Sequence, residues 1–495
     1  MDSFFSALST IADPYLLTVI VAATIGGVLV GALPGLTSTM ATALLVPFTV
    51  FMDPIPAISM LAALYCAGTF GGSITAILIN APGAPPAAAT ALDGYPMAQK
   101  GEAGRALGMA TVASTIGGIF SVIVMAAAAP MLARMAYQFG PPEYFALALF
   151  GLSMLASISK GSATRNLIGG AFGVLVATVG LDFTTGVERF TFGIPELTEG
   201  INFIPVMIGI FGGAELLSQS ATLNVVYDRV TAIAVRLPSR ADFMRCWKTI
   251  ARSCGIGTFI GILPAEGGTI AAMVGYNEAR RWSKTPDEFG SGCIEGIAGP
   301  EAANNAATGG AMVPTLALGI PGSGTTAVIL AALMVKGLRP GPFLFQEQPD
   351  LLYGIFAAML IANLMFLGIG LVGAKLFARI TLIPRTFLWP AVFTLAVIGS
   401  FALEQSVADI YIMFVFALLG FVFKRYGFAP APIIMGIILG GLVENTLKQS
   451  MLLFDMQWWM FFGRPICLVF FALTIAGLAG PYIMARFRAF KNGKA

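Results

Sequence analysis

An apolar segment covering residues 15–51 is interrupted in its middle by proline and glycine. The interruption, residues 31–39, reads Gly-Ala-Leu-Pro-Gly-Leu-Thr-Ser-Thr. Proline removes a backbone donor and breaks a helix, and in a bilayer the freed peptide groups must be buried in protein or line a wet cavity. A related segment, Gly-Ile-Leu-Pro-Ala-Glu-Gly-Gly-Thr, recurs at residues 261–269. Two interrupted helices at corresponding places in two halves point to the binding site of a transporter.

The composition is that of a membrane protein. Of the 495 residues, 57% are hydrophobic and only 11% are charged, whereas soluble domains carry about 25% charged residues. We therefore predict an all-α, polytopic membrane protein with about 11 to 12 transmembrane helices in the lipid bilayer. The absence of histidine excludes Ser-His and Cys-His catalysis and the usual zinc sites. The net charge of +3 is too small to indicate a nucleic-acid partner.

The distribution of basic residues predicts a topology, because cytoplasmic loops are enriched in Lys and Arg. Asp13 and Asp53 flank the first break without a basic residue nearby, so we place both flanks and the N-terminus outside. The basic linker 218–252 is placed in the cytoplasm, and so is the basic C-terminal tail. Arg280 and Lys284 follow the second break, which is therefore expected to enter from the cytoplasm. Residues 1–217 and 253–495 would then form two transmembrane halves, with residues 83–104 as a cytoplasmic loop.

The two halves resemble each other in sequence. Without gaps, five positions of the first break match five of the second: Gly27, Gly31, Leu33, Pro34 and Thr39 match Gly257, Gly261, Leu263, Pro264 and Thr269. Residues 71–83 resemble residues 310–322 in the same order. Because the two hairpins are predicted to enter from opposite faces, we expect an inverted-topology repeat.

Small hydroxyl residues and glycines follow each break. Unpaired amides at a helix N-terminus favour an anion, and glycine allows close approach of the backbone to a ligand. The predicted substrate-binding residues are Gly35, Thr37, Ser38, Thr39, Ser73, Gly83, Gly268, Thr269, Gly322, Ser323, Thr325 and Thr326.

Backbone carbonyls freed at the breaks suit a small cation such as Na⁺. The predicted cation-binding positions are Pro34, Asn80, Pro82, Pro264, Glu266, Asn304, Asn305 and Pro321. No other metal and no cofactor is expected, and the coupling ion stays open between Na⁺ and H⁺. Simpler interpretations stay open as well: close helix packing at the glycines, helix ends at the prolines, an interhelical hydrogen bond at the asparagines, water-facing Glu266 and Glu301, and a structural Asp93.

Several long strings resemble a known family. They are residues 31–39, 71–83 and 92–108, residues 299–306 with the sequence Gly-Pro-Glu-Ala-Ala-Asn-Asn-Ala, and residues 315–323. Together they are similar to the large membrane subunit of the tripartite tricarboxylate transporters, over nearly the whole chain. The resemblance implies a bacterial inner-membrane symporter that receives a carboxylate from a periplasmic solute-binding protein and works beside a small membrane subunit. By analogy it also implies an elevator-like movement.

One position departs from the family pattern. The second break has Pro264-Ala265-Glu266-Gly267 where the family tends to have Pro-Gly-Ala-Gly, and we hypothesise that Glu266 tunes ion coupling. Two rival functions remain, a carboxylate channel and an intramembrane enzyme. The missing histidine removes the serine-histidine version of the enzyme.

Overall fold

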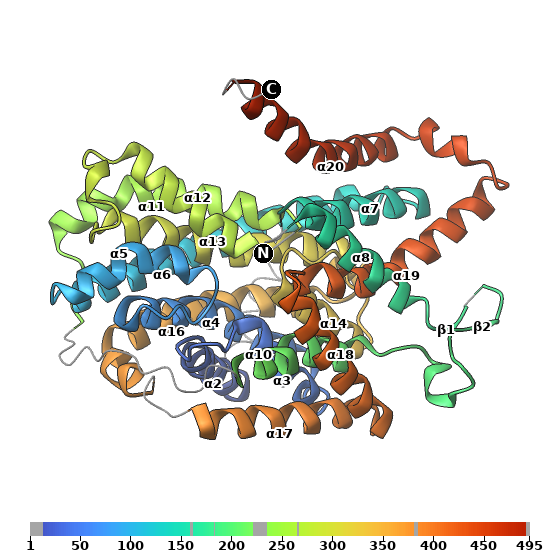
Figure 1. Cartoon of the computed structure of the whole chain (residues 1–495), viewed down its shortest axis with the longest axis horizontal. Helices are drawn as coiled ribbons and strands as arrows, with labels where there is room; N and C mark the ends of the chain where they lie inside the picture. Colours follow the sequence, from blue (N-terminus) through green and yellow to red (C-terminus); the bar gives the residue numbers. More distant parts are fainter. Residues whose placement is uncertain are drawn as a thin grey trace.

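The computed structural model describes residues 13–158, 162–182, 184–220, 235–264, 267–380 and 385–491. Within these ranges the chain is almost entirely helical, which confirms the predicted all-α class (Figure 1). The described strands are the two-residue pair β1 (Gly180–Leu181) and β2 (Glu188–Arg189), which form a small antiparallel hairpin.

The first half begins with the predicted broken segment. Its helices are α2 (Pro14–Gly31), α3 (Ser38–Thr49), α4 (Pro54–Ile79), α5 (Ala87–Gln99), α6 (Ala103–Ala136), α7 (Pro141–Ile158) and α8 (Ala163–Ala177). After β1 and β2 come the 3₁₀ turn η1 (Pro195–Leu197) and one continuous helical segment with a π-helical middle, made of α9 (Phe203–Met207), η2 (Ile208–Gly213) and α10 (Ala214–Ser220).

The second half begins with the second broken segment. Its elements are α11 (Arg240–Ile262), α12 (Gly267–Trp282), the 3₁₀ turn η3 (Pro286–Glu288), α13 (Glu295–Leu318), α14 (Gly324–Val335), α15 (Leu344–Glu347), α16 (Pro349–Ile380), α17 (Arg385–Glu404), α18 (Val407–Arg425), α19 (Pro430–Leu453), the 3₁₀ turn η4 (Trp458–Gly463) and α20 (Pro465–Lys491).

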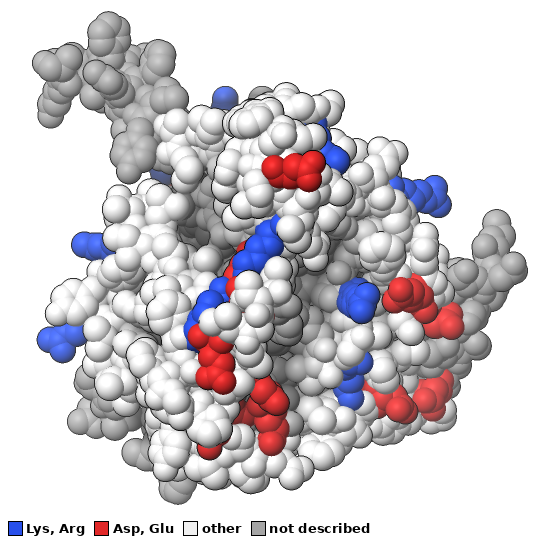
Figure 2. All heavy atoms as spheres, turned by 90° about the vertical axis from the view of Figure 1, so that its right-hand side faces the viewer, with Lys and Arg blue, Asp and Glu red and all other residues white. Residues whose placement is uncertain are grey.

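The outer surface is suited to lipid. Six described helices are long and apolar enough to cross a membrane, and six shorter helices are also apolar. Large hydrophobic side chains such as Phe259, Val372 and Leu418 are exposed. In Figure 2 the charged side chains gather along the middle and toward one side of the face in view, and most of the remaining described surface is uncharged. The chain is therefore a multi-pass membrane protein.

Both predicted breaks are present. The first helix ends at Gly31 and the chain resumes as a helix at Ser38. The second helix ends at Ile262 and resumes at Gly267. Residues 32–37 of the first break and residues 263 and 264 of the second are non-helical, as the proline and glycine pattern predicts.

One expectation about a loop is wrong. Residues 83–104 contain the helix α5, because Pro85 and Pro86 precede its first turn instead of ending an element, and proline is tolerated there. The helix α11 begins at Arg240, so its first turns belong to the predicted linker 218–252. The Ser239 side chain caps this helix by accepting a hydrogen bond from the amide of Asp242 at 3.1 Å. Residues 221–234 of the linker lie outside the described residues.

The two broken helices pack on their neighbours in the same way. A methyl group on Gly31 of α2 would lie 2.3 Å from the carbonyl oxygen of Gly68 in α4, and one on Gly261 of α11 would lie 2.5 Å from that of Ala307 in α13. Glycine at these positions lets two backbones touch. The corresponding contacts agree with the sequence match between the halves, while their opposite orientation in the bilayer stays a prediction.

The helices α4 and α13 also end alike. Asn80 and Gly319 both adopt left-handed backbone conformations, with φ of 51° and 70°. Their amides donate to the carbonyl oxygens of Thr75 and Pro314. Each end turns the chain sharply, so that α5 and α14 begin beside the two broken segments.

Candidate functional site

A pocket of about 540 Å³ lies where the broken segments meet. Residues at or just before the first turns of α3, α5, α12 and α14 contribute to its wall. Helix N-termini carry partial positive charge, so their convergence favours an anionic ligand. At α5 the first amides donate to the carbonyl oxygens of residues 84–86, so only the other three helices can offer unpaired amides. The wall combines hydroxyl, amide and apolar groups: Thr37, Ser38, Thr39, Tyr65, Thr69, Ala84, Pro85, Pro86, Ile210, Phe211, Ala214, Glu215, Gly268, Thr269, Asn304, Thr308, Ser323, Gly324, Thr325, Gly420, Lys424, Gly427, Phe428, Ala429 and Pro430.

The first break places the start of α3 at this pocket. Gly35 has φ of +91°, a conformation that glycine adopts readily, and it lets the chain reverse before α3. The Thr37 hydroxyl then accepts a hydrogen bond from the amide of Met40 at 3.1 Å and caps the helix. The side-chain amide of Gln219 donates to the Gly35 carbonyl at 3.2 Å, which satisfies one of the backbone groups that the break frees.

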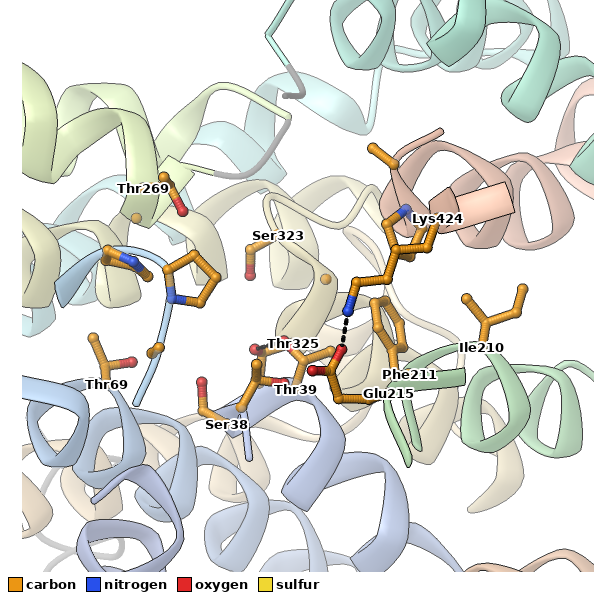
Figure 3. Close-up of a pocket in the computed structure, with 18 of the residues that line it drawn as sticks. Ser38, Thr39, Thr69, Ile210, Phe211, Glu215, Thr269, Ser323, Thr325 and Lys424 are labelled. Atoms are coloured by element: carbon orange, nitrogen blue, oxygen red, sulfur yellow. Dashed lines mark hydrogen bonds and ion pairs between the residues drawn. The ribbon is translucent and has the colours of Figure 1, made fainter. Parts of the chain in front are cut away.

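The start of α14 is built by a capping box. The Ser323 hydroxyl accepts from the amide of Thr326 at 3.2 Å, and the Thr326 hydroxyl accepts from the amide of Ser323 at 2.8 Å. This arrangement orients Thr325, which lies between the two capping residues and whose hydroxyl is 2.7 Å from that of Thr39 in α3. The N-terminal turns of the two helices thus meet at the pocket (Figure 3).

The start of α12 faces Asn304 of α13. A methyl group on Gly268 would lie 3.0 Å from the Asn304 side-chain oxygen, so glycine gives this amide its space. Asn304 is 2% exposed, and its Nδ2 group has no hydrogen-bond partner among the described atoms. A buried, unpaired donor in a pocket wall is suited to bind an oxygen of a ligand.

An ion pair at one end of the pocket was not predicted. Lys424 of α18 lies 2.6 Å from the Glu215 carboxylate of α10, and Figure 3 shows the two side chains reaching toward each other beside Phe211. The sequence places Lys424 next to Arg425 at a helix end, where a basic pair ordinarily marks the cytoplasmic side. Its sequence context therefore gave no reason to expect it in a binding pocket.

Buried hydroxyls of α4 and α13 were also missed. Tyr65 and Thr69 of α4 and Thr308 of α13 line the pocket, and the Tyr65 hydroxyl lies 3.3 Å from that of Ser323. The available signal was the spacing of one helical turn, which puts Tyr65 with Thr69, and Asn304 with Thr308, on one helix face.

The structure brings together eight of the predicted site residues: Thr37, Ser38, Thr39, Gly268, Thr269, Asn304, Ser323 and Thr325. Two other predicted residues, Gly83 and Gly322, lie outside the lining and pack closely against neighbouring backbone. A methyl group on Gly83 would lie 1.9 Å from the Gly31 carbonyl oxygen, and one on Gly322 would lie 2.7 Å from the Cα atom of Ala311. Also outside the lining are Pro34, Gly35, Ser73, Asn80, Pro82, Pro264, Asn305, Pro321 and Thr326.

Three acidic residues were singled out in the sequence, and the structure describes two of them. Glu266 lies outside the described residues. Glu301 is fully buried, so the interpretation that it faces water is wrong. Asp93 is also fully buried, and its carboxylate accepts 2.8 Å hydrogen bonds from the amides of Gly290, Gly292 and Cys293. These bonds tie α5 to the turn before α13, which fits the structural interpretation of Asp93.

Comparison with known proteins gives a consistent result. Residues 17–435 match the family described as the tripartite tricarboxylate transporter TctA family. An uncharacterised 52.8 kDa protein of the TAR-I ttuC′ 3′ region of Agrobacterium vitis is 40% identical over 453 residues, which cover 91% of this chain and 90% of that protein. A second uncharacterised Agrobacterium vitis protein, from the TAR-II ttuC′ 3′ region, is 38% identical over 210 residues, which cover 42% of this chain and 87% of that protein. No solved structure matches. The chain belongs to the tripartite tricarboxylate transporter TctA family.

Proposed function

We propose that this chain is the membrane-spanning subunit of a binding-protein-dependent secondary transporter. It imports a tricarboxylate or a related carboxylate by symport with Na⁺ or H⁺. The observation that carries the proposal is the convergence of the N-termini of α3, α12 and α14 and the unpaired Asn304 amide on one pocket. Such a site stabilises negative charge within a membrane protein without an arginine clamp.

The substrate carboxylates bind between the N-terminal turns of α3 and α14. Ser38 and Ser323 donate hydroxyl hydrogen bonds, and so does whichever of Thr39 and Thr325 accepts the bond that joins them. Asn304 donates from its unpaired amide. These donors come from residues far apart in sequence, so a bound carboxylate holds several helices together.

Lys424 gives the site its specificity for acids. In this structure its ammonium group is paired with Glu215. A substrate carboxylate takes the place of Glu215 beside Lys424, so the ammonium group is never left unpaired in the pocket. A neutral analogue cannot make this exchange and binds more weakly.

The subunit works in the inner membrane beside a small transmembrane subunit, and a periplasmic solute-binding protein delivers the substrate. Its N-terminus is periplasmic and its C-terminus cytoplasmic, which the acidic and basic flanks of the breaks support. The two halves are inverted repeats, and an elevator-like movement of the parts that carry α3 and α12 exposes the pocket alternately to the two sides. The matching contacts of Gly31 and Gly261 support this duplication.

Uptake in cells that carry all three subunits tests the proposal. A panel of radiolabelled mono-, di- and tricarboxylates is supplied with and without Na⁺, and with and without a proton gradient. The proposal predicts saturable uptake of at least one carboxylate that requires all three subunits and one of the two gradients. Failure of every carboxylate contradicts the proposal, whereas uptake without accelerated exchange favours a channel.

A further inference from the structure

Glu301 of α13 is a fully buried carboxyl group without a cationic partner among the described residues. Instead it accepts hydrogen bonds from three hydroxyl groups. Ser73 of α4 donates to Oε1 at 2.5 Å, Ser114 of α6 donates to Oε2 at 2.8 Å, and Thr90 of α5 also donates to Oε1. An ionisable group inside a membrane protein is costly and points to function.

Glu301 and two of its hydroxyl partners, Ser73 and Thr90, each lie one helical turn from a residue that lines the pocket. Asn304 follows Glu301 by one turn on α13, Thr69 precedes Ser73 by one turn on α4, and Pro86 precedes Thr90 by one turn on α5. All three of these neighbours line the pocket, and Thr69 is labelled in Figure 3. A change in the charge of Glu301 therefore acts on three parts of the pocket wall.

Other titratable groups near α13 have partners of their own. Asp93 of α5 is held by backbone amides and the Tyr276 hydroxyl, and Tyr65 of α4 bonds to Ser323. Others are Cys66 of α4 with Thr308, Arg105 of α6 with Glu102 and Asp242, Arg245 of α11 with Glu288 and Glu295, and Arg281 of α12 with Glu278. Cys246 and Cys254 of α11 are buried thiols. None of them is within hydrogen-bond or ion-pair distance of Glu301.

We propose that Glu301 is the proton-binding site of the transporter and that Ser73, Thr90 and Ser114 position its carboxyl group. The inference deepens the proposed function, since it assigns the coupling ion as H⁺. The oxygen distances are those of hydrogen bonds, and a cation shared by these oxygens would have to push them apart. A proton needs no such rearrangement, because it adds to one carboxylate oxygen while a hydroxyl turns from donor to acceptor.

Protonation couples to substrate through charge. With Glu301 ionised, a second anion one turn away is disfavoured, whereas the neutral acid accepts a substrate carboxylate in the pocket. The proton taken up with the substrate is released when the pocket opens to the opposite side and the carboxylate leaves. One proton and one substrate anion thus move together.

Infrared difference spectroscopy of the purified full chain in liposomes tests the inference without any substrate. Between about pH 5 and about pH 9, the wild type is expected to show a carboxylic-acid band that disappears with rising pH. Glu301→Gln lacks this band. The matched variant Glu295→Gln retains it, because Glu295 is on the same helix α13 but its carboxyl pairs with Arg245 of α11. Identical titrating bands in wild type and Glu301→Gln overturn the inference.

Ser114→Ala keeps the Glu301 carboxyl group and provides a second test if Glu301→Gln does not fold. Loss of one donor disfavours the ionised form, so the band is expected to titrate about 1 pH unit higher. An unchanged midpoint contradicts the role of this cluster. Binding of radioactive Na⁺ to the wild type that is lost in Glu301→Gln makes the cluster a Na⁺ site and also overturns the inference.

Transport of a named probe separates this inference from the proposed function. The assay uses vesicles with all three subunits and radiolabelled citrate. Glu301→Gln is expected to retain citrate exchange, while its rate of uptake driven by a proton gradient falls at least tenfold. Unaltered proton-driven uptake by this variant refutes the proton site while leaving carboxylate transport intact. If citrate is not transported at all, the infrared result still decides the role of Glu301.

Discussion

The hydroxyl of Thr39 lies 2.7 Å from the hydroxyl of Thr325, although 286 positions separate the two residues in the chain. One belongs to the first turn of α3 and the other to the first turn of α14. The contact therefore joins a helix that follows the first break to a helix of the second half. It places two helix N-termini at one pocket, where their partial positive charges act on the same ligand.

Thr39→Val tests whether this contact takes part in substrate binding. Valine keeps the shape but loses the hydroxyl, so we expect the KM for the transported carboxylate to rise about 2- to 10-fold. Thr49→Val on the same helix is the matched control, since Thr49 is buried outside the pocket and its hydroxyl donates only to the Val46 carbonyl. An equal rise in KM for both variants argues against a specific role for Thr39.

Lys424→Gln tests the only basic side chain of the described pocket wall. Loss of a charge-assisted hydrogen bond is expected to weaken carboxylate binding about 10- to 100-fold in equilibrium binding to the purified chain. Lys448→Gln is the control, because Lys448 pairs with Asp182 and Glu444 away from the pocket. Unaltered affinity in Lys424→Gln removes the assignment of this lysine.

Gly31→Ala and Gly261→Ala test the close contact of the broken helices with their neighbours. Each added methyl group would meet a carbonyl oxygen at 2.5 Å or less, so we expect a loss of about 1 to 3 kcal/mol in the free energy of unfolding, or more. Gly26→Ala and Gly255→Ala are controls on the same two helices, where a methyl group meets no atom within 4 Å. Thermal unfolding in detergent compares the pairs, and equal melting temperatures would contradict this packing.

Asp53→Cys and Lys284→Cys test the predicted topology. Both positions are exposed, and the five native cysteines are buried, so labelling by a membrane-impermeant maleimide reports the new thiols. We expect Asp53→Cys to react from the periplasmic side and Lys284→Cys from the cytoplasmic side. Labelling of both from one side excludes the inverted arrangement.

The hydrogen bonds of Asp182, in the loop that carries β1 and β2, predict that the stability of the protein depends on pH. Lys448 and the amide of Thr184 hold the pKa of Asp182 well below its usual value, through hydrogen bonds of 2.6 and 2.8 Å. Because the folded-state pKa is lowered, the stabilisation is present above the unfolded pKa and is lost as pH falls through the folded value. Asp182→Asn should therefore lower the melting temperature most above about pH 5 and little at acid pH. Glu196→Gln in the same loop is an exposed control, and a difference from wild type that does not depend on pH would contradict this origin.

The local features of the site could be predicted from sequence. Proline and glycine act on the backbone where they stand, so Pro34 and Pro264 marked both breaks, and the hydroxyl of Thr37 after the first break caps α3. The helix α5 was missed because Pro85 and Pro86 resemble loop residues until the turn that follows them is known.

The contacts between distant segments could not be predicted in this way. Nothing in the sequence near Lys424 indicates that it meets Glu215, which is 209 positions away. The burial of Glu301 likewise depends on Ser73, Thr90 and Ser114, each on another helix. Such pairs become visible only when the packing of the helices is known.

The most direct test of the account is accelerated exchange in liposomes that contain the purified chain and the small subunit, with the solute-binding protein supplied outside. Liposomes loaded with unlabelled carboxylate take up labelled carboxylate from a panel, and the rate is compared between wild type and Lys424→Gln. The account predicts that internal carboxylate accelerates entry of the labelled compound in the wild type and that Lys424→Gln needs about 10 to 100 times more external substrate for the same rate. Entry that internal carboxylate does not accelerate, or equal acceleration by an uncharged analogue, would contradict the proposed carboxylate-binding pocket.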